Sequence, residues 1–156
     1  MFGHIDDIDS WVNHFSLIKN VQNKTHGFTE VVPLPFVHMG SPIYLRGKSM
    51  PGPTWDEIVL IHSLARIYFV NLIDNIQASW VKLGHDGAGK LLHAGVNDLG
   101  GTLINENISR ASGADHGQET TQDQFIQIIE SENKNPVLRN TLYTEFIETK
   151  NSLEKR

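Results

Sequence analysis

The chain of 156 residues contains no cysteine. A chain without cysteine forms no disulfide and offers no thiolate to a catalytic step, to zinc or to an iron–sulfur cluster. Histidine occurs eight times, but neither the His-x-x-x-His nor the His-Glu-x-x-His spacing of zinc sites is present. We therefore expect no metal site built from the residues of this chain.

Basic residues and long apolar runs are also scarce. Thirteen Lys and Arg face eighteen Asp and Glu, for a net charge of −5, and the bases are spread thinly rather than gathered in a patch that would bind nucleic acid. No apolar run approaches the roughly 18 residues of a membrane span, and residues 1–7 lack the features of a signal peptide. We expect a cytoplasmic globular chain that contacts neither nucleic acid nor membrane.

Apolar residues at steps of three and four predict several helices. The first begins near Asp9 or Ser10 and ends by Gly27, and its buried face comprises Ile8, Trp11, Val12, Phe15, Ile18 and Val21. Capping boxes at residues 54–57 and 121–124 predict two more helix starts, the first of them opening a well-buried helix. A short helix is expected over residues 86–93.

Strands are predicted between these helices. They cover residues 28–32 and 76–81, with a further short strand ending near Val96 and a stump at the amino terminus before His4. Strands that alternate with helices indicate an α/β fold with parallel pairing, and polar groups after the strands then meet on one face. A stump and three more strands cannot close a barrel. The chain thus resembles the back half of a larger α/β barrel.

One glycine-rich stretch, residues 95–117, gathers polar side chains and offers few apolar ones. Its glycines let the backbone turn sharply or approach a ligand closely, so Asn97, Asp98, Thr102, Glu106 and Arg110 could grip a polar small molecule. The same stretch could equally be a loop between a strand and a helix, with Asp98 as a cap. It has neither the phosphate-loop nor the dinucleotide glycine spacing.

Six runs carry a resemblance to a known family. They are Gly-Phe-Thr-Glu-Val-Val-Pro-Leu-Pro-Phe-Val-His at residues 27–38, Ser-Pro-Ile-Tyr-Leu at 41–45, Gly-Pro-Thr at 52–54, Asn-Ile-Gln-Ala-Ser-Trp-Val-Lys-Leu-Gly at 75–84, Asn-Asp-Leu-Gly-Gly-Thr at 97–102 and His-Gly-Gln-Glu at 116–119. In this order they resemble the carboxyl-terminal half of the radical S-adenosylmethionine enzymes that build the deazaflavin chromophore of coenzyme F-420, the FO synthase family. The resemblance extends from Met1 to about Tyr143.

This resemblance implies a partial (β/α)6 barrel with a helical carboxyl-terminal extension. It also implies a 4Fe-4S cluster, S-adenosylmethionine, and transfer of the 4-hydroxybenzyl part of tyrosine to 5-amino-6-(D-ribitylamino)uracil. The family holds its cluster with a Cys-x-x-x-Cys-x-x-Cys loop that this sequence lacks. We therefore expect the chain to be inactive by itself and to need its amino-terminal half or a second radical S-adenosylmethionine subunit. A piece of a futalosine-route menaquinone enzyme and a non-catalytic small-molecule-binding remnant are the alternatives.

The family run at residues 97–102 and the positions of polar side chains at or after the predicted strands give the expected site residues, although no catalytic residue can be named. The expected cofactor-binding residues are Asn97, Asp98, Gly100, Gly101 and Thr102, and the expected substrate-binding residues are His4, His38, Gln77, Ser79, Glu106 and Arg110. Each has a plain alternative, such as a cap or turn for Asp98, a solvated position for Glu106 and an internal ion pair for Arg110. Gln77 and Ser79 share one strand face, with Trp80 and Lys82 on the other.

The expected organisation is a half-barrel over residues 1–120, a helical extension over residues 121–148 and a disordered tail over residues 149–156. Gly40 departs from the family pattern, where a larger residue is expected.

Overall fold

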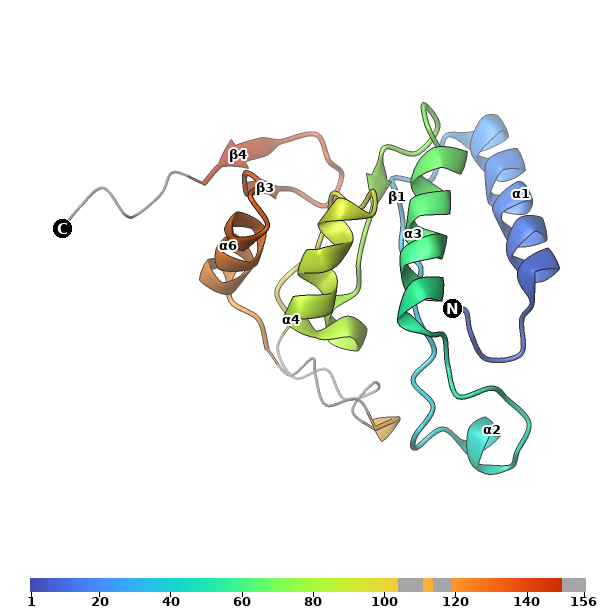
Figure 1. Cartoon of the computed structure of the whole chain (residues 1–156). Coiled ribbons are helices and arrows are strands. Elements are labelled where there is room, and N and C mark those ends of the chain that lie inside the picture. Colours follow the sequence, from blue (N-terminus) through green and yellow to red (C-terminus); the bar gives the residue numbers. More distant parts are fainter. Residues whose placement is uncertain (104–110, 114–118, 150–156) are drawn as a thin grey trace.

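The computed structural model describes residues 1–103, 111–113 and 119–149 of the chain. Short strand segments in the middle of the molecule pair in parallel (Figure 1). Strand β1 (Glu30–Val31) pairs with β2 (Asn75–Ile76), and parallel bridges join Phe2 to Pro35 and Gln77 to Asp98. Four segments thus lie side by side in chain order, which confirms the α/β class. Strands β1 and β2 are shorter than the strands predicted at residues 28–32 and 76–81, and the fourth segment, at Asp98, lies just after the strand predicted to end near Val96.

Helix α1 (Ile8–Thr25) follows the first segment and closely matches the predicted range. The Asp7 carboxylate accepts a hydrogen bond from the Ser10 amide at 2.8 Å, and His26 ends the helix in the left-handed conformation. The predicted buried face is partly wrong: Phe15 is buried, whereas Ile8 and Val12 are 70% and 57% exposed. Periodicity identifies an apolar face but not how much of it finds a neighbour.

Helix α3 (Trp55–Tyr68) follows the short helix α2 (Pro42–Leu45) and starts with the predicted capping box. Ile61 and Ala65 on its inner side enter the core. The expectation of a well-buried helix holds for that side alone, because Leu60 and Ile67 on the opposite side are 46% and 71% exposed. None of the helices within the described ranges is both long and apolar enough to cross a membrane.

The strand predicted over residues 76–81 is wrong beyond its beginning. The chain turns at Ser79 into helix α4 (Trp80–Lys90), which bends at Gly84 and continues into the short helix η1 (Leu91–His93). Trp80 and Val81 favour strands by propensity. Tertiary packing overrides this propensity, since the Trp80 ring is 3% exposed and its centroid lies 6.1 Å from that of Phe125.

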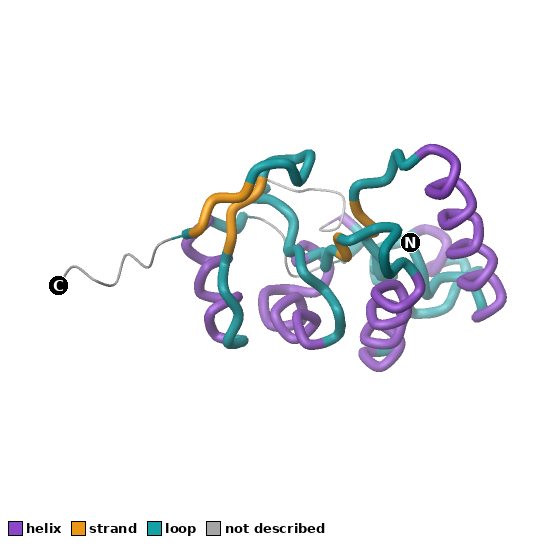
Figure 2. The backbone as a smooth tube through the Cα atoms, turned by 90° about the horizontal axis from the view of Figure 1, so that it is seen from above, coloured by secondary structure: helices purple, strands orange, loops and turns teal. Residues whose placement is uncertain are grey.

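The two faces of the paired segments differ in polarity. Side chains alternate across a strand, so Val31, Ile76 and Ala78 lie on one face, where they join a core with residues of α1, α3 and α4. Figure 2 shows the helices following one another in an open row along one side of the strand segments. The opposite face, which we call the inner face, presents Glu30, Gln77 and Asp98.

The carboxyl-terminal part contains helix α6 (Gln122–Ser131), which starts with the second predicted capping box. A hairpin of antiparallel strands β3 (Val137–Arg139) and β4 (Phe146–Glu148) follows, beside α6 in Figure 1. The segment expected to be a helical extension is therefore helical only as far as Ser131. Pro136 lies between the helix and the hairpin, where it cannot continue a helix.

Candidate functional site

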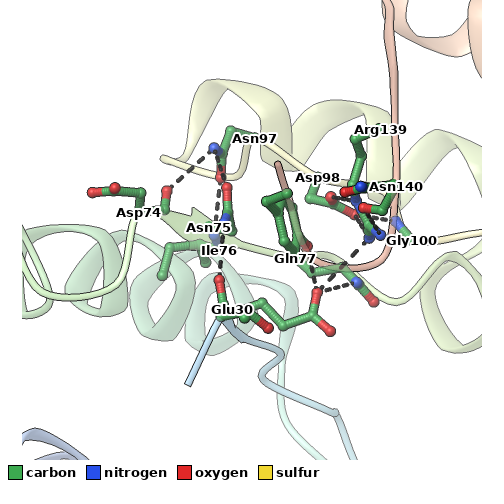
Figure 3. Close-up of polar contacts among 12 residues, drawn as sticks. Glu30, Asp74, Asn75, Ile76, Gln77, Asn97, Asp98, Gly100, Arg139 and Asn140 are labelled. Atoms are coloured by element: carbon green, nitrogen blue, oxygen red, sulfur yellow. Dashed lines mark hydrogen bonds and ion pairs between the residues drawn. The ribbon is translucent and has the colours of Figure 1, made fainter. Parts of the chain in front are cut away.

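The inner face carries a connected group of polar side chains, shown in part in Figure 3. Glu30, Gln77 and Asp98 come from adjacent parallel segments, and Arg139 and Tyr143 come from the β3–β4 hairpin. We call these five residues the inner-face cluster. Because residues from opposite ends of the chain meet here, the fold rather than local sequence assembles the cluster.

Asp98 is the most buried carboxylate of the cluster, with a side chain that is 7% exposed. Its Oδ2 accepts from Arg139 Nε at 2.6 Å, and its Oδ1 accepts from Arg139 Nη2 at 3.1 Å and from the Gly100 amide at 2.6 Å. The hydrogen bond to Asp98 raises the pKa of Arg139 above its ordinary value, despite an opposing effect of burial. This two-pronged geometry fixes the plane of the carboxylate.

Glu30 occupies the other end of the cluster. Its Oε2 accepts from Gln77 Nε2 at 2.7 Å and from the Tyr143 hydroxyl at 2.6 Å, while Arg139 Nη2 lies 3.9 Å away. Burial and then the hydrogen bond to Glu30 raise the pKa of Tyr143, so the phenol stays protonated and acts as a donor. Two carboxylates thus share one guanidinium, and the cluster as a whole is anionic.

A cavity of about 640 Å³ lies between the Gly-Gly run, α6 and the hairpin. Asp98, Gly100, Gly101, Thr102 and Arg139 contribute to its lining on one side. Its apolar lining includes Leu92, Phe125, Ile126, Ile129 and Phe146. A small-molecule site commonly combines apolar walls with a few oriented polar groups in such a volume.

The two glycines of the run have different roles. Gly100 has a φ of +80°, and a Cβ there would lie 3.1 Å from Gln77 Oε1, so a side chain would press on the inner-face cluster. Among the described residues, a Cβ at Gly101 would meet nothing within 4 Å. The carbonyl of Gly101 accepts a hydrogen bond from Trp80 Nε1 at 3.2 Å, which ties the run to α4. The backbone at Gly101 therefore borders open space in the cavity.

Asn97 precedes Asp98 but points away from it, as Figure 3 shows. Its Oδ1 accepts from Arg66 Nη2 at 2.6 Å and from the Ile76 amide at 2.9 Å. Arg66 also donates to the carbonyl oxygen of Gly95 at 2.7 Å. These bonds fasten the start of the run to α3 and β2, so Asn97 has a structural role beside its predicted cofactor contact.

The two predicted histidines lie at the ends of neighbouring segments but make other contacts. His4 Nδ1 lies 2.8 Å from Asp6 Oδ1, and its ring centroid is 5.7 Å from that of Phe36. The ring of His38 packs edge-on against Tyr44 at 4.6 Å between centroids. Both are half-buried, and substrate contact remains a prediction for each.

Ser79 is the residue before α4, where its side chain makes no capping hydrogen bond, and Thr102 is exposed at the cavity. Glu106 and Arg110 lie outside the described residues.

Gly40 is required by geometry, because a Cβ there would lie 2.7 Å from the Ala111 carbonyl oxygen. The departure from the family pattern at Gly40 therefore fits the packing of this chain.

Sequence reasoning missed Glu30, Arg139 and Tyr143. A signal existed for Glu30, which is the one charged residue of the strand predicted at residues 28–32. The run Val137-Leu138-Arg139 after Pro136 reads as a strand, but nothing local indicates that it lies beside Asp98. Within residues 1–103, 111–113 and 119–149, no group of three His, Asp or Glu side chains could hold a metal ion.

Parallel segments in chain order, with helices on one face, define an α/β protein, and the polar cluster beside the cavity is its candidate site. A family model described as the CofH/MqnC C-terminal region matches residues 25–153. This match covers most of the chain, and the protein belongs to that family.

Named relatives agree with this assignment. Over 143 residues the chain is 51% identical to a Methanopyrus kandleri protein named 5-amino-6-(D-ribitylamino)uracil–L-tyrosine 4-hydroxyphenyl transferase, covering 92% of this chain and 39% of the relative. Identity is 46% to a protein of that name from Methanothermobacter thermautotrophicus, covering 94% and 40%. A Mycobacterium leprae protein named FO synthase is 46% identical, covering 92% and 17%. The chain spans about two fifths of the length of the two transferases.

Proposed function

We propose that this chain forms the carboxyl-terminal, ligand-binding part of a radical S-adenosylmethionine transferase of FO synthesis. The observation that carries the proposal is the position of the run at residues 97–102, whose Asp98 and Gly100 line a cavity of about 640 Å³. In this role the complete enzyme joins the 4-hydroxybenzyl part of tyrosine to 5-amino-6-(D-ribitylamino)uracil. The names of the relatives support this reaction.

The residues of the cavity suit S-adenosylmethionine or the ribitylaminouracil. A carboxylate has about four acceptor positions, and Asp98 uses three of them for Arg139 and Gly100. Tyr143 also lies within hydrogen-bonding reach of Asp98, so a ribose or ribityl hydroxyl or an amino group of the ligand would compete with this phenol for the fourth position. Phe125 and Ile129 offer apolar surface for a ring. S-adenosylmethionine, when bound, supplies the radical that activates tyrosine.

The iron–sulfur cluster does not fit the residues of this chain. With no cysteine in the sequence, no thiolate is present to hold the irons. We propose that the cluster belongs to another part of the enzyme, either the preceding half of a longer protein or a second subunit. In that assembly the inner face of the paired segments lines the interior of a partial (β/α)6 barrel, so that Glu30, Gln77 and Asp98 point towards the reaction.

A non-catalytic remnant with a retained pocket is the second candidate. Such a chain would keep the cavity of about 640 Å³ and bind a small molecule there without taking part in the chemistry. A futalosine-route enzyme is less well supported, since the relatives described above carry transferase and FO synthase names.

Binding to the purified chain tests the proposed ligand site. Calorimetric titration with S-adenosylmethionine and, separately, with 5-amino-6-(D-ribitylamino)uracil should give saturable binding for at least one of them. The Asp98→Asn variant should bind that ligand about tenfold more weakly, because a charged acceptor is lost. The matched Asp56→Asn variant, changed at an exposed position on α3, should bind normally.

Reconstitution separates a transferase part from a remnant. We would combine the chain with the part of the Methanopyrus kandleri transferase that precedes the matched region, then supply tyrosine, the ribitylaminouracil, S-adenosylmethionine and a reductant. Coupled product should form only when both parts are present. Ligand binding without any product would favour the remnant.

A further inference from the structure

The β3–β4 hairpin is attached to the inner face through polar side chains rather than through an apolar core. Its apolar residues remain largely open, with Leu142, Phe146 and Ile147 exposed by more than 60%. Arg139 and Tyr143 instead reach Asp98 and Glu30, respectively. A hairpin held mainly for stability would be expected to bury its apolar side chains, so its polar attachment suggests a role at the cavity.

Arg139 is the centre of this attachment. Two of its nitrogens bond the Asp98 carboxylate, and its guanidinium carbon lies 4.2 Å from the centroid of the Tyr143 ring. Its side chain is 22% exposed and lines the cavity. Desolvation largely offsets the attraction of such a partly buried ion pair, so the net contribution of the pair to folding is small. The geometry instead fixes where the Asp98 oxygens lie.

Tyr143 holds the guanidinium from its other side. It is a non-glycine residue with a φ of +56°, a conformation that costs energy for a bulky side chain. The turn around it is fixed by the Thr144 amide, which donates to Asn140 Oδ1 at 3.0 Å, and by Asn140 Nδ2, which donates to Thr144 Oγ1 at 2.8 Å. These bonds fix the turn that places the Tyr143 ring against the Arg139 guanidinium.

The cluster has one guanidinium for two carboxylates, which makes the role of Arg139 specific. Without it, Asp98 and Glu30 would face the same space with no described cation between them. Asp98 would then repel Glu30 and turn towards water, and Gly100 would lose the acceptor of its amide. The effect would reach the cavity wall although Arg139 belongs to the distant hairpin.

We propose that Arg139 is a positioning residue of the candidate site, which orients the Asp98 carboxylate towards the ligand while Tyr143 holds the guanidinium in place. The identity of the ligand in this inference rests on the proposed function. The geometry of Arg139, Asp98 and Tyr143 does not depend on that function. It assigns the hairpin to the site, although the sequence presents it as an extension of the fold.

The geometric part is tested by the Gly100 amide, which donates to Asp98. In the purified chain, NMR spectra of wild type, Arg139→Lys, Arg139→Gln and the matched control Arg46→Gln would be compared, with thermal unfolding measured for each. Arg139→Gln should shift the Gly100 amide signal and increase its hydrogen exchange about tenfold. Arg46 is exposed and lies outside the cavity lining, so its loss should leave the signal unchanged.

The ligand part is tested by the calorimetric titration described above. Arg139→Gln should weaken binding of the ligand that the wild type takes by about tenfold. The affinity of Arg139→Lys should lie between those of the wild type and Arg139→Gln, because a lysine keeps the charge without the two-pronged geometry. If folded Arg139→Gln keeps the wild-type Gly100 signal and affinity, the positioning role is wrong. If the wild type binds neither ligand, the proposed function fails, and the Gly100 signal still decides the geometry.

Discussion

Gly95 and Gly101 lie in the same stretch but differ in how strongly the structure requires a glycine. Gly95 has a φ of +92°, and a Cβ there would lie 2.6 Å from Arg66 Cβ, whereas a Cβ at Gly101 meets nothing within 4 Å in the described part of the chain. Gly95→Ala should lower the free energy of unfolding by about 1–3 kcal/mol, and Gly101→Ala should change it by less than about 0.5 kcal/mol. Urea unfolding of both variants measures the difference. Equal effects would mean that the backbone at Gly95 is not constrained.

Asp6 should make the free energy of unfolding depend on pH. Burial raises its pKa, but hydrogen bonds from the Gly3 amide, Trp11 Nε1 and the His4 amide together outweigh burial and hold the pKa below its ordinary value. A depressed folded pKa stabilises the fold fully above the unfolded pKa of about 4, and this stabilisation is lost as pH falls towards the folded value.

Asp6→Asn should therefore cost about 1–3 kcal/mol from pH 7 down to about pH 5 and progressively less below that, as the unfolded-state carboxyl takes up its proton. Urea unfolding of this variant and of Asp56→Asn between pH 7 and pH 3 checks the sign. A difference from wild type that grows as pH falls would contradict this account of Asp6.

The elements that sequence predicts best are those fixed by local contacts. In the α3 capping box, the Glu57 amide donates to Thr54 Oγ1 at 3.3 Å and the Thr54 amide donates to Glu57 Oε2 at 2.7 Å. Thr54→Ala should lower the free energy of unfolding by about 1 kcal/mol. Thr54→Ser keeps the hydroxyl and should cost less than half of that. A Ser variant as unstable as the Ala variant would show that the hydroxyl does not cap the helix.

Elements that depend on distant contacts were predicted less well. Trp80 and Val81 have strand propensity, yet packing against Phe125 of α6 makes them the start of a helix. The hairpin was missed because its two strands pair with each other and its link to Asp98 spans 41 positions. The stretch at residues 97–102 was located from its glycines and polar residues, but its partners Glu30, Arg139 and Tyr143 follow from tertiary structure alone.

In the whole molecule, parallel segments and their helices bring residues 113 positions apart in the sequence to one face. Glu30 of the second segment and Tyr143 of the hairpin are joined by a 2.6 Å hydrogen bond. The family relationship, the cavity and the inner-face cluster are the three observations behind our proposal that this chain forms a ligand-binding wall of an FO synthase-type transferase.

Titration of the folded chain with S-adenosylmethionine and with 5-amino-6-(D-ribitylamino)uracil, in wild type and Asp98→Asn, tests this claim most directly. We expect saturable binding of at least one ligand and about tenfold weaker binding in the variant. Binding of neither ligand by the folded wild type, or equal binding by Asp98→Asn, would contradict it.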